Sequence, residues 1–424
     1  MDTRRSAHWF RTLTFALLSL AVARTVFPIT LDPTFAIGGR FVTSFAATGE
    51  PSSAANAVFM QPQARIIVTG SHSQQGTTGR TVGIAIAGLT VGGVLDNSFG
   101  TAGKVVVWSP VLNRYPTNSL VLDDGSIVVF YRHSESLSSN RPGLMKFSPT
   151  GQHDPAFDPD LNLFPNATYP VVAAKASSGK IYTLVRNGYQ HYLIRLNSDG
   201  SRDGTFAPNG VRSVPLQRFG TEPRVSALEE LPNGKILLAG GYYAPLGYGQ
   251  TFVTRFDANG NIDRSFGIQG TARLAVDGGH VETAKILVQP DGKVLVAGAW
   301  TFLGSNTYLA RLTARGRPDA GFGDRGVVMT SFNNLNMIHG IALGSDGRVH
   351  VAGTSGVKAV PSNPRLFVIR YSAAGVQESS LVSDFASGSD SHATNLLLQA
   401  DGKVVVCGYS TGSNGQLAAA RFLP

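Results

Sequence analysis

The sequence has few of the residues from which covalent cross-links and metal sites are built. Its 424 residues contain one cysteine, Cys407, so no disulfide can form within the chain. A thiolate metal site needs several such sulfurs, and the nine histidines include no H-x-H or HExxH pair. We therefore expect neither a metal site nor a cofactor, and we expect Cys407 to be a small buried apolar side chain.

Long apolar runs are also scarce. One lies at the N-terminus, from Leu13 to Ala23, preceded by Arg4 and Arg5 and ending in Ala-Val-Ala. A charged start, a short apolar stretch and small residues at its end are typical of a signal peptide, and the run is shorter than the about 20 residues that span a membrane. We predict cleavage after Ala23, export to the periplasm, cell surface or medium, and a mature chain, residues 24–424, without a transmembrane span. An uncleaved anchor is the alternative.

Charge of one sign is not concentrated in the chain. The formal net charge is +9, but lysine and arginine are spread through the sequence without a run of about five or more like charges. A nucleic-acid-binding protein usually shows a basic stripe or a known module. The sequence therefore predicts no nucleic-acid partner and favours a mildly cationic monomer.

What the sequence does have is an internal repeat. Seven units each contain a turn such as Asp291-Gly292-Lys293, an aliphatic run ending in Gly, a run ending near Arg, and a turn that reads LDxSFGxxG. The Asp and Phe of this last turn recur at Asp32 and Phe35, Asp96 and Phe99, Asp154 and Phe157, Asp203 and Phe206, Asp263 and Phe266, and Asp319 and Phe322. A seventh, eroded copy has Glu378 and Leu381 in these positions. A repeat of this kind determines the architecture.

Each unit has the features of four short strands. In the fifth unit we expect them at about 283–289, 293–298, 307–312 and 327–332, where Val-rich and Ile-rich runs are bounded by turn residues. Asp-Gly between the first two runs favours a tight hairpin. Four antiparallel strands per unit predict an all-β protein, a seven-bladed β-propeller in which neighbouring blades protect the strand edges. A β-solenoid is the alternative, but its coils are usually shorter.

The two ends of the chain are out of phase with the repeat. The chain stops after a third-strand pattern at Ala420-Arg421-Phe422, and the LDxSF turn that should follow stands near the other end, at Asp32 and Phe35. A strand at about 39–45 comes next. We therefore predict that this N-terminal strand completes the last blade beside the C-terminal strand, so that neither end can separate without breaking backbone hydrogen bonds.

The two turn patterns together resemble the delta-60 repeat, a bacterial repeat family. The resemblance covers nearly all of residues 24–424 and implies a β-propeller-like fold and a secreted or surface location, but no reaction. The second and third units depart from it, since Tyr131 and Val185 replace the Gly that closes the second strand, and the turn after Asp154 lacks its later Gly.

The repeated Asp and Phe have a structural interpretation. Asp at the start of a turn accepts hydrogen bonds from backbone N–H groups two or three residues on. Phe, three residues later, is placed to pack between adjacent blades, and Gly supplies positive φ angles. We therefore expect these residues to hold the blades together.

Two short motifs suggest chemistry only weakly. Ser410 lies in a G-x-S-x-G sequence, which positions a nucleophile only on a strand-to-helix turn, whereas the next run here is another strand. Asp158, Asp160 and Asn162 have the spacing that begins a calcium loop, but the Gly that makes its sharp turn and the later Glu ligand are missing. A polar turn is the simpler interpretation.

Binding residues are expected on the face where the connections differ among units, since loops on a rigid scaffold usually carry function. Aromatic and basic residues in these connections are the candidate ligand-binding residues: Tyr242, Tyr243, Tyr248, Trp300, Phe302, His191 and Arg132. We expect a binding or scaffold module for a glycan, a peptide or an envelope component. An extracytoplasmic lyase or glycan hydrolase with its active site in the central funnel, and a structural envelope component without a ligand, are the alternatives. No catalytic residue can be named.

Overall fold

The structure is a computed structural model, which describes residues 27–45, 52–76, 79–108, 113–136, 139–157, 167–176, 179–219, 223–243, 249–274, 280–301, 305–331, 336–356, 363–411 and 415–424. The expected leader, the expected calcium-like turn at 158–162, Tyr248 and Phe302 lie outside these ranges. The described part contains no helix long and apolar enough to cross a membrane.

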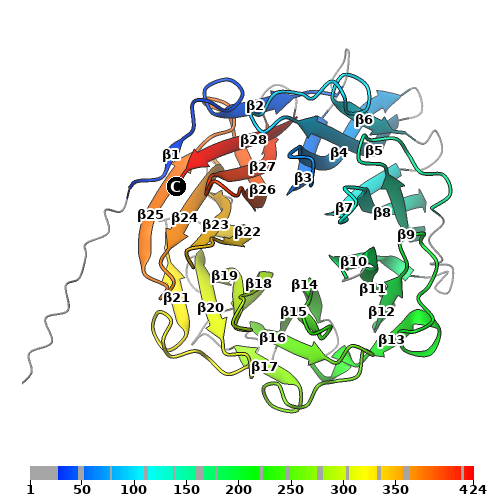
Figure 1. Ribbon diagram of the computed structural model, residues 1–424, viewed down its shortest axis with the longest axis vertical. Coiled ribbons are helices and arrows are strands. Elements are labelled where there is room, and N and C mark those ends of the chain that lie inside the picture. The colour runs from blue at the N-terminus through cyan, green and yellow to red at the C-terminus, as the bar shows by residue number, and fades with distance from the viewer. Residues whose placement is uncertain are drawn as a thin grey trace, which may run out of the picture.

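Seven antiparallel sheets stand around a central opening (Figure 1). Blade one comprises β3 (Ser52–Met60), β4 (Ile66–Gly76), β5 (Gly79–Leu89) and β6 (Lys104–Val107); blade two β7 (Asn113–Val121), β8 (Ile127–Ser136) and β9 (Ser139–Phe147); and blade three β10 (Ala167–Lys175), β11 (Ile181–Asn187), β12 (Gln190–Leu196) and β13 (Val211–Val214). Two short 3-10 helices, Pro208–Gly210 and Leu216–Phe219, flank β13.

The remaining blades follow in chain order. Blade four comprises β14 (Arg224–Glu230), β15 (Ile236–Tyr243), β16 (Gly249–Phe256) and β17 (Thr271–Leu274); blade five β18 (His280–Val288), β19 (Val294–Thr301), β20 (Ser305–Leu312) and β21 (Val327–Thr330); and blade six β22 (Asn336–Leu343), β23 (Val349–Ser355), β24 (Arg365–Tyr371) and β25 (Gln377–Ser383). Blade seven comprises β26 (Ser391–Leu398), β27 (Val404–Ser410) and β28 (Gln416–Leu423), with β1 (Thr30–Leu31) and β2 (Arg40–Thr43). The predicted seven-bladed propeller is confirmed. In blade two the place of a fourth strand falls at 158–166, outside the described residues.

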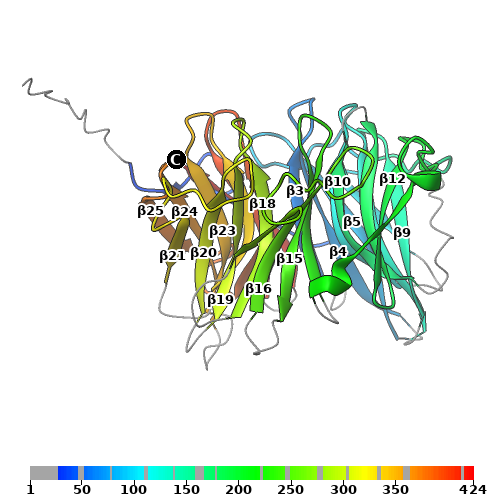
Figure 2. The same cartoon turned by 90° about the horizontal axis from the view of Figure 1, so that it is seen from below.

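The turn sequences account for the hairpins. In blade five the Asp291 carboxylate accepts a hydrogen bond from the backbone N–H of Lys293 at 3.1 Å, and Gly292 has a φ of 79°. Such a φ is easily adopted only by residues like glycine. The seven hairpin turns of this kind and the LDxSF turns lie on one side of the ring, here called the turn face, which is the upper edge in Figure 2. The opposite side is called the loop face.

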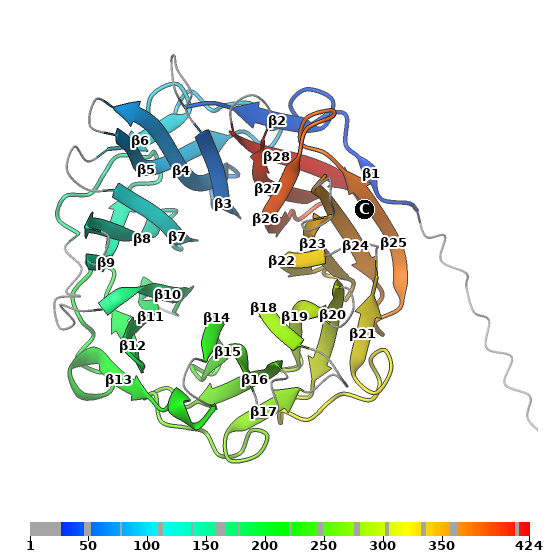
Figure 3. The same cartoon turned by 180° about the vertical axis from the view of Figure 1, so that it is seen from behind.

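The N-terminal segment closes the ring. β2 pairs with β28 from Arg40 opposite Ala420 to Thr43 opposite Leu417, and β1 extends the same edge beyond the LDxTF turn. In Figure 3 these first two strands lie along β28. The prediction that the two ends of the chain share one sheet is therefore confirmed.

The hydrophobic core is divided among the junctions between blades. Seven clusters of buried side chains each draw their members from two neighbouring blades. Side chains of a radially placed sheet alternate between its two faces, and each face meets the next blade. Stability is thus spread around the ring, and it depends on every junction being closed.

A charged clasp reinforces these junctions on the turn face. At the junction of blades four and five, Arg255 donates from Nε to Asp263 Oδ2 at 2.8 Å and from Nη1 to the Ala314 carbonyl of blade five at 2.7 Å. Asp263 also accepts hydrogen bonds from the backbone N–H of Ser265 at 3.0 Å and from Lys235 Nζ at 2.8 Å. One carboxylate therefore fixes its own turn and, through Arg255, the neighbouring blade.

The repeated Phe completes the clasp. Phe266 is fully buried, with the Arg255 guanidinium 4.7 Å from its ring centre. On its other side lies Gly316 of blade five, where a Cβ atom would come within 2.9 Å of the ring. The turn glycine of the next blade is thus required by a close approach as well as by its φ of 76°.

The clasp survives substitution in blades one and six. In blade one Gly88 occupies the arginine position, and Arg65, from the hairpin turn, bonds Asp96 at 2.7 Å and the Pro149 carbonyl of blade two at 2.8 Å instead. In blade six the carboxylate of Glu378 replaces that of Asp and is bonded by Arg348 and Arg370. Different residues thus preserve the same ion pair.

We expect Asp263→Asn to lower the free energy of unfolding by about 3–5 kcal/mol, because it leaves the mostly buried Arg255 without its counter-charge. Burial alone would raise the pKa of Asp263, but hydrogen bonds from Lys235 and Ser265 and the charge of Arg255 outweigh it and lower the pKa. The ionised carboxylate therefore stabilises the folded protein at pH values above the ordinary Asp pKa. The difference in unfolding free energy between the parent and Asp263→Asn should decrease as the pH falls below about 4.

Denaturant unfolding at several pH values measures this. Asp291→Asn is the matched control, since that side chain is 55% exposed and its loss costs at most about 1 kcal/mol. Equal effects of the two substitutions at neutral pH would contradict a role for the clasp.

Candidate functional site

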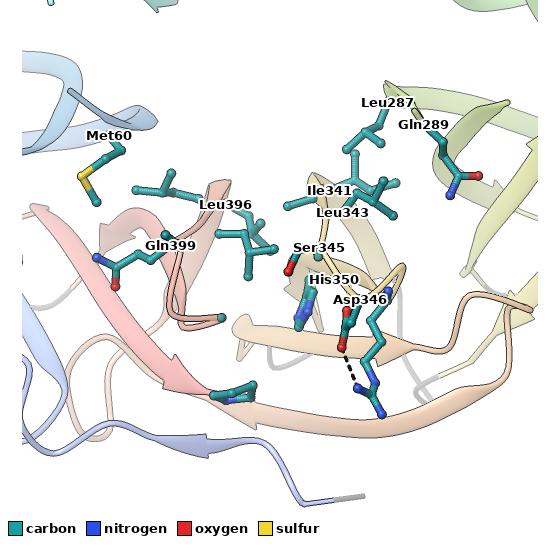
Figure 4. A pocket seen from close by; sticks show the side chains of 18 of the residues that line it. Met60, Leu287, Gln289, Ile341, Leu343, Ser345, Asp346, His350, Leu396 and Gln399 are labelled. Atoms are coloured by element: carbon teal, nitrogen blue, oxygen red, sulfur yellow. Dashed lines mark hydrogen bonds and ion pairs between the residues drawn. The ribbon is translucent and has the colours of Figure 1, made fainter. Parts of the chain in front are cut away.

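A hollow of about 1540 Å³ lies at the turn-face mouth of the central channel (Figure 4). The ends of inner strands from six blades line it, β3, β7, β14, β18, β22 and β26, together with the turns that follow several of them. Met60, Leu287, Ile341 and Leu343 are partly exposed there, and Leu396 is nearly buried. The wall is therefore largely apolar and accessible from the turn face.

The register of the inner strands explains this apolar wall. Each inner strand contains a β-bulge, and the position four residues after the first bulge residue is equivalent in all seven blades. The residues at this position are Phe59, Leu120, Ala174, Glu229, Leu287, Ala342 and Leu397. Six are apolar, and Glu229 is the one charged member of the ring.

The walls of the channel shift the charge equilibrium of Glu229. Crowding by the walls, and next the charge of neighbouring Glu230, raise the pKa of the Glu229 carboxyl to about 7, against the attraction of Lys285. Glu229 is exposed to the channel, so water reaches the carboxyl group and screens part of this effect. Glu229 thus exchanges its proton near neutral pH.

Two further titratable groups lie deeper in the channel wall. Burial lowers the pKa of the Lys285 ammonium, and burial together with the charges of Lys285 and His392 lowers that of His339 to about 4. His339 is therefore a neutral imidazole at neutral pH. Within the described residues no hydrogen bond or ion pair joins Glu229, Lys285 and His339 into a nucleophile–base arrangement.

Glu229 and Glu230 do not form a glycosidase pair with each other. Two carboxyl groups must flank one bond in most glycan hydrolases. Glu229 and Glu230 are consecutive residues of β14 and so point to opposite faces of the strand. The one carboxylate on the ring position has no second carboxylate at the equivalent positions of the other blades.

The polar rim of the hollow has unsatisfied hydrogen-bonding capacity. Gln289 Oε1 and His350 Nδ1 are buried, and neither has a hydrogen-bond partner within the part of the chain that the structure describes. Burial, and secondarily Arg370, lower the pKa of His350 to about 4, so its ring is neutral at neutral pH. A buried polar atom without a partner is costly, and both side chains belong to the lining of the hollow.

The loop-face candidates are placed differently from one another. Tyr242 is 7% exposed, packs its ring against Phe219 and Phe252, and donates its hydroxyl to Gln250 at 2.5 Å. His191 is also buried, and burial with the charge of Arg186 lowers its pKa to about 4. The rings of these two candidates are therefore inside the blades.

The other candidates are only partly defined. Trp300 packs against the cluster between blades four and five, whereas Tyr242 belongs to the cluster between blades three and four, so the two rings lie at different junctions. Arg132 is half-buried, with its guanidinium 4.7 Å from the Tyr115 ring centre. For Tyr243 only the backbone is described, and Tyr248 and Phe302 are outside the described residues.

Ser410 has no nucleophilic environment. It lies on β27, is 1% exposed, and its Oγ is 2.6 Å from Ser389 Oγ. The stacked pair of His392 and Tyr409 occupies the preceding register position, on the opposite face of the hairpin. The G-x-S-x-G sequence is therefore part of a buried strand.

Comparison with known families agrees with the fold. Residues 177–206, 231–266, 289–322 and 399–424 match a family model described as "Domain of unknown function (DUF5122) beta-propeller". The match supports a β-propeller repeat family. These segments cover the hairpin and LDxSF turns of units three, four and five and the hairpin turn of unit seven. The delta-60 name stays a prediction. No curated protein matches the chain.

Solved structures show only distant likeness. A protein of unknown function from Dyadobacter fermentans is 14% identical, with 91% of this chain and 99% of that chain covered and a TM-score of 0.43. The Nup133 β-propeller domain of Vanderwaltozyma polyspora is 10% identical, with 90% and 100% covered and a TM-score of 0.46. Drosophila Plexin A, in complex with Semaphorin 1b, is 10% identical, with 88% of each chain covered and a TM-score of 0.41. These likenesses say nothing about a ligand.

We expect Glu229→Gln to stabilise the protein above neutral pH. Because the folded-state pKa is raised above the ordinary Glu value, the folded protein binds the extra proton between about pH 4.3 and 7, and its stability falls as the pH rises through this window. Glu229→Gln removes that loss of stability. The gain is less than about 1 kcal/mol at pH 8, because water screens the group.

Unfolding free energies of both proteins at pH 4 and pH 8 give the result directly. Asp401→Asn, whose side chain is 52% exposed on the turn face, is the control and should show no such pH dependence. A Glu229→Gln variant that is less stable than the parent at pH 8 would show that the ionised carboxylate is favourable in the channel.

Proposed function

We propose that this protein is a binding module whose ligand occupies the turn-face mouth of the central channel. The observation that carries the proposal is the combination of an accessible, largely apolar hollow with two buried polar atoms, on Gln289 and His350, that have no hydrogen-bond partner in the described residues. Ligand sites are typically concave and mostly apolar, with a few polar groups that fix orientation.

Among a glycan, a peptide and an envelope component, the wall favours a peptide segment with apolar side chains. Leu287, Ile341 and Leu343 offer aliphatic contacts, and Phe59 is the one aromatic residue at the ring position. A sugar ring usually stacks on an aromatic face, whereas apolar peptide side chains gain from any apolar burial, at roughly 25 cal/mol per Å². The rim amide of Gln289 would then bond the peptide backbone.

The loop face remains a second candidate surface. Arg132 stacked on Tyr115, and Trp300, are the described residues that support it, while the contribution of Tyr243, Tyr248 and Phe302 stays a prediction. The buried rings of Tyr242 and His191 favour a role in packing instead.

An enzyme remains the alternative because of Glu229. A carboxyl group whose pKa lies near 7 is suited to general acid–base catalysis, and an exposed channel would admit substrate. A lyase reaction is compatible with one such carboxyl group, whereas most glycan hydrolases need two. A structural envelope component without a ligand is the remaining alternative. It gives no explanation for the polar atoms of Gln289 and His350 that are unpaired within the described residues.

We also propose export with cleavage after Ala23 and a monomeric state. The sequence of the first 23 residues supports the former, and the closed ring, with no unpaired end at β28, supports the latter. The delta-60 resemblance would be consistent with a secreted or surface location.

Blocking the channel mouth tests the proposal. We expect Ala342→Trp to weaken binding of 8-anilinonaphthalene-1-sulfonate, and of a peptide selected from a random display library, by roughly tenfold or more, a loss of about 1.4 kcal/mol. Val376→Trp is the matched control, since Val376 is 63% exposed on the rim outside the hollow. Both variants should retain the parent melting temperature.

The loop face provides the opposing arm. If Arg132→Ala and Trp300→Ala abolish peptide binding while Ala342→Trp leaves it intact, the ligand site is on the loop face and the channel-mouth proposal is wrong. The enzyme alternative has its own test. If the parent protein converts a substrate and the Glu229→Gln variant does not, the protein is an enzyme that uses Glu229.

A further inference from the structure

Three exposed arginines lie on the two turns that meet on the turn face where blade four adjoins blade five. Arg264 follows the clasp residue Asp263, and Arg315 and Arg317 flank Gly316 in the turn between β20 and β21. The junction fixes their positions, because the Gly267 N–H donates to the Arg315 carbonyl at 2.7 Å and Gly316 packs on the Phe266 ring. We call these three residues the arginine cluster.

The charge of the arginine cluster is not neutralised by the protein. Within the described residues, which include both turns completely, no side chain accepts a hydrogen bond or ion pair from Arg264, Arg315 or Arg317. The nearby Asp263 carboxylate is already bonded by Lys235 and Arg255. The three guanidinium groups are exposed, so water and salt screen the repulsion between them, and an anion bound there would reduce what remains.

The repeat itself provides an internal comparison. At the five equivalent junctions the position after the clasp Asp is Pro33, Asn97, Pro155, Gly204 or Ala320, and the two turn positions of the next blade are Gly92 and Val94, Thr150 and Gln152, Asp199 and Ser201, Asn259 and Asn261, or Ala374 and Val376. None of these fifteen residues is a cation. The fold therefore does not require arginine at any of the three positions.

The arginines border a concave surface. A hollow of about 520 Å³ is lined by Arg255, Ser265, Gly267, Arg315 and Arg317. It adjoins a second hollow of about 640 Å³, which shares Gly267 and Arg317 and adds the exposed Arg273 and Ile268. The two together form a groove along the rim, separate from the channel mouth.

We propose that this groove binds sulfate or phosphate ester groups carried on a polysaccharide. A guanidinium fork matches such oxyanions with two parallel hydrogen bonds. Because the arginines are exposed, water and salt screen any single contact, so useful affinity requires several anionic groups on one chain, each adding a contact. A groove admits an extended polymer, whereas a flat bilayer would not enter it, and Ile268 and Pro318 offer apolar contact to sugar rings.

Dextran sulfate is the probe, and neutral dextran is its uncharged counterpart. The test variant carries Arg264→Gln, Arg315→Gln and Arg317→Gln, and the matched control carries Arg80→Gln, Arg141→Gln and Arg224→Gln, three exposed arginines that do not line the groove. We expect the test variant to bind dextran sulfate at least tenfold more weakly than the parent, and the control within about twofold. The affinity of the parent should fall as salt is raised, and neutral dextran should not bind.

The outcomes separate this inference from its rivals. Equal losses in the two triple variants would show that net charge alone is responsible and would overturn it, as would an unchanged test variant. Binding of inorganic sulfate as tightly as the polymer, or arginine-dependent binding of phosphatidylglycerol vesicles without dextran sulfate binding, would replace the polysaccharide by a small anion or a membrane.

The groove and the channel mouth can be tested independently. Ala342→Trp should leave dextran sulfate binding unchanged, and the arginine triple variant should leave peptide binding unchanged, each at the parent melting temperature. A triple variant with a lowered melting temperature would show that the arginines stabilise the junction, and the inference would fail for that reason.

Discussion

A carboxylate–arginine ion pair at the turn face lies in six of the seven blades as described, and in four of these blades the arginine also bonds a carbonyl of the next blade. Asp263 and Arg255 are both mostly buried, and the arginine also holds a carbonyl of blade five. A charge removed from water is stable only when it is paired and hydrogen-bonded, so the pair fixes two blades in one geometry. Arg421 and Asp32, 389 residues apart, make the same pair at the point where the ring closes. At this junction the ion pair joins two segments from opposite ends of the chain.

The clasp also determines where the protein is free to vary. Asp, Phe and the turn Gly are constrained at the junctions by hydrogen bonds and close packing, whereas the position after Asp and the residues beside the turn Gly face solvent. The channel-lining position of the inner strands, which Glu229 occupies in blade four, likewise takes no part in the clasp. Glu229 in the channel and the arginine cluster at the rim are two departures from the repeat at such unconstrained positions. Function on a repeat scaffold is expected where the repeat is broken without a structural reason.

The fold could be predicted from the sequence because each unit repeats the same turn residues. Closure of the ring could also be predicted, because the C-terminal third strand is not followed by an LDxSF turn and such a turn stands at Asp32 near the other end. The channel mouth could not, since Met60, Leu287 and Leu343 come from three blades and converge only when the ring is closed. Counting four residues from each inner-strand bulge would have aligned Glu229 with six apolar residues, but the bulge is not visible in sequence. Tyr242 was a reasonable ligand candidate on composition alone, and only packing against Phe219 and Phe252 shows that its ring is internal.

The central claim is that the N-terminal segment closes the ring through the same clasp that joins the other blades. Comparing chains that begin at residue 27 and at residue 46 by denaturant unfolding tests it most directly, because the shorter chain loses β1, β2, Asp32 and the buried Phe35 and Phe41. Burial of the two phenylalanines alone is worth roughly 3 kcal/mol or more, so the account predicts at least that loss, with faster amide exchange in β28. Equal unfolding free energies for the two chains would contradict it.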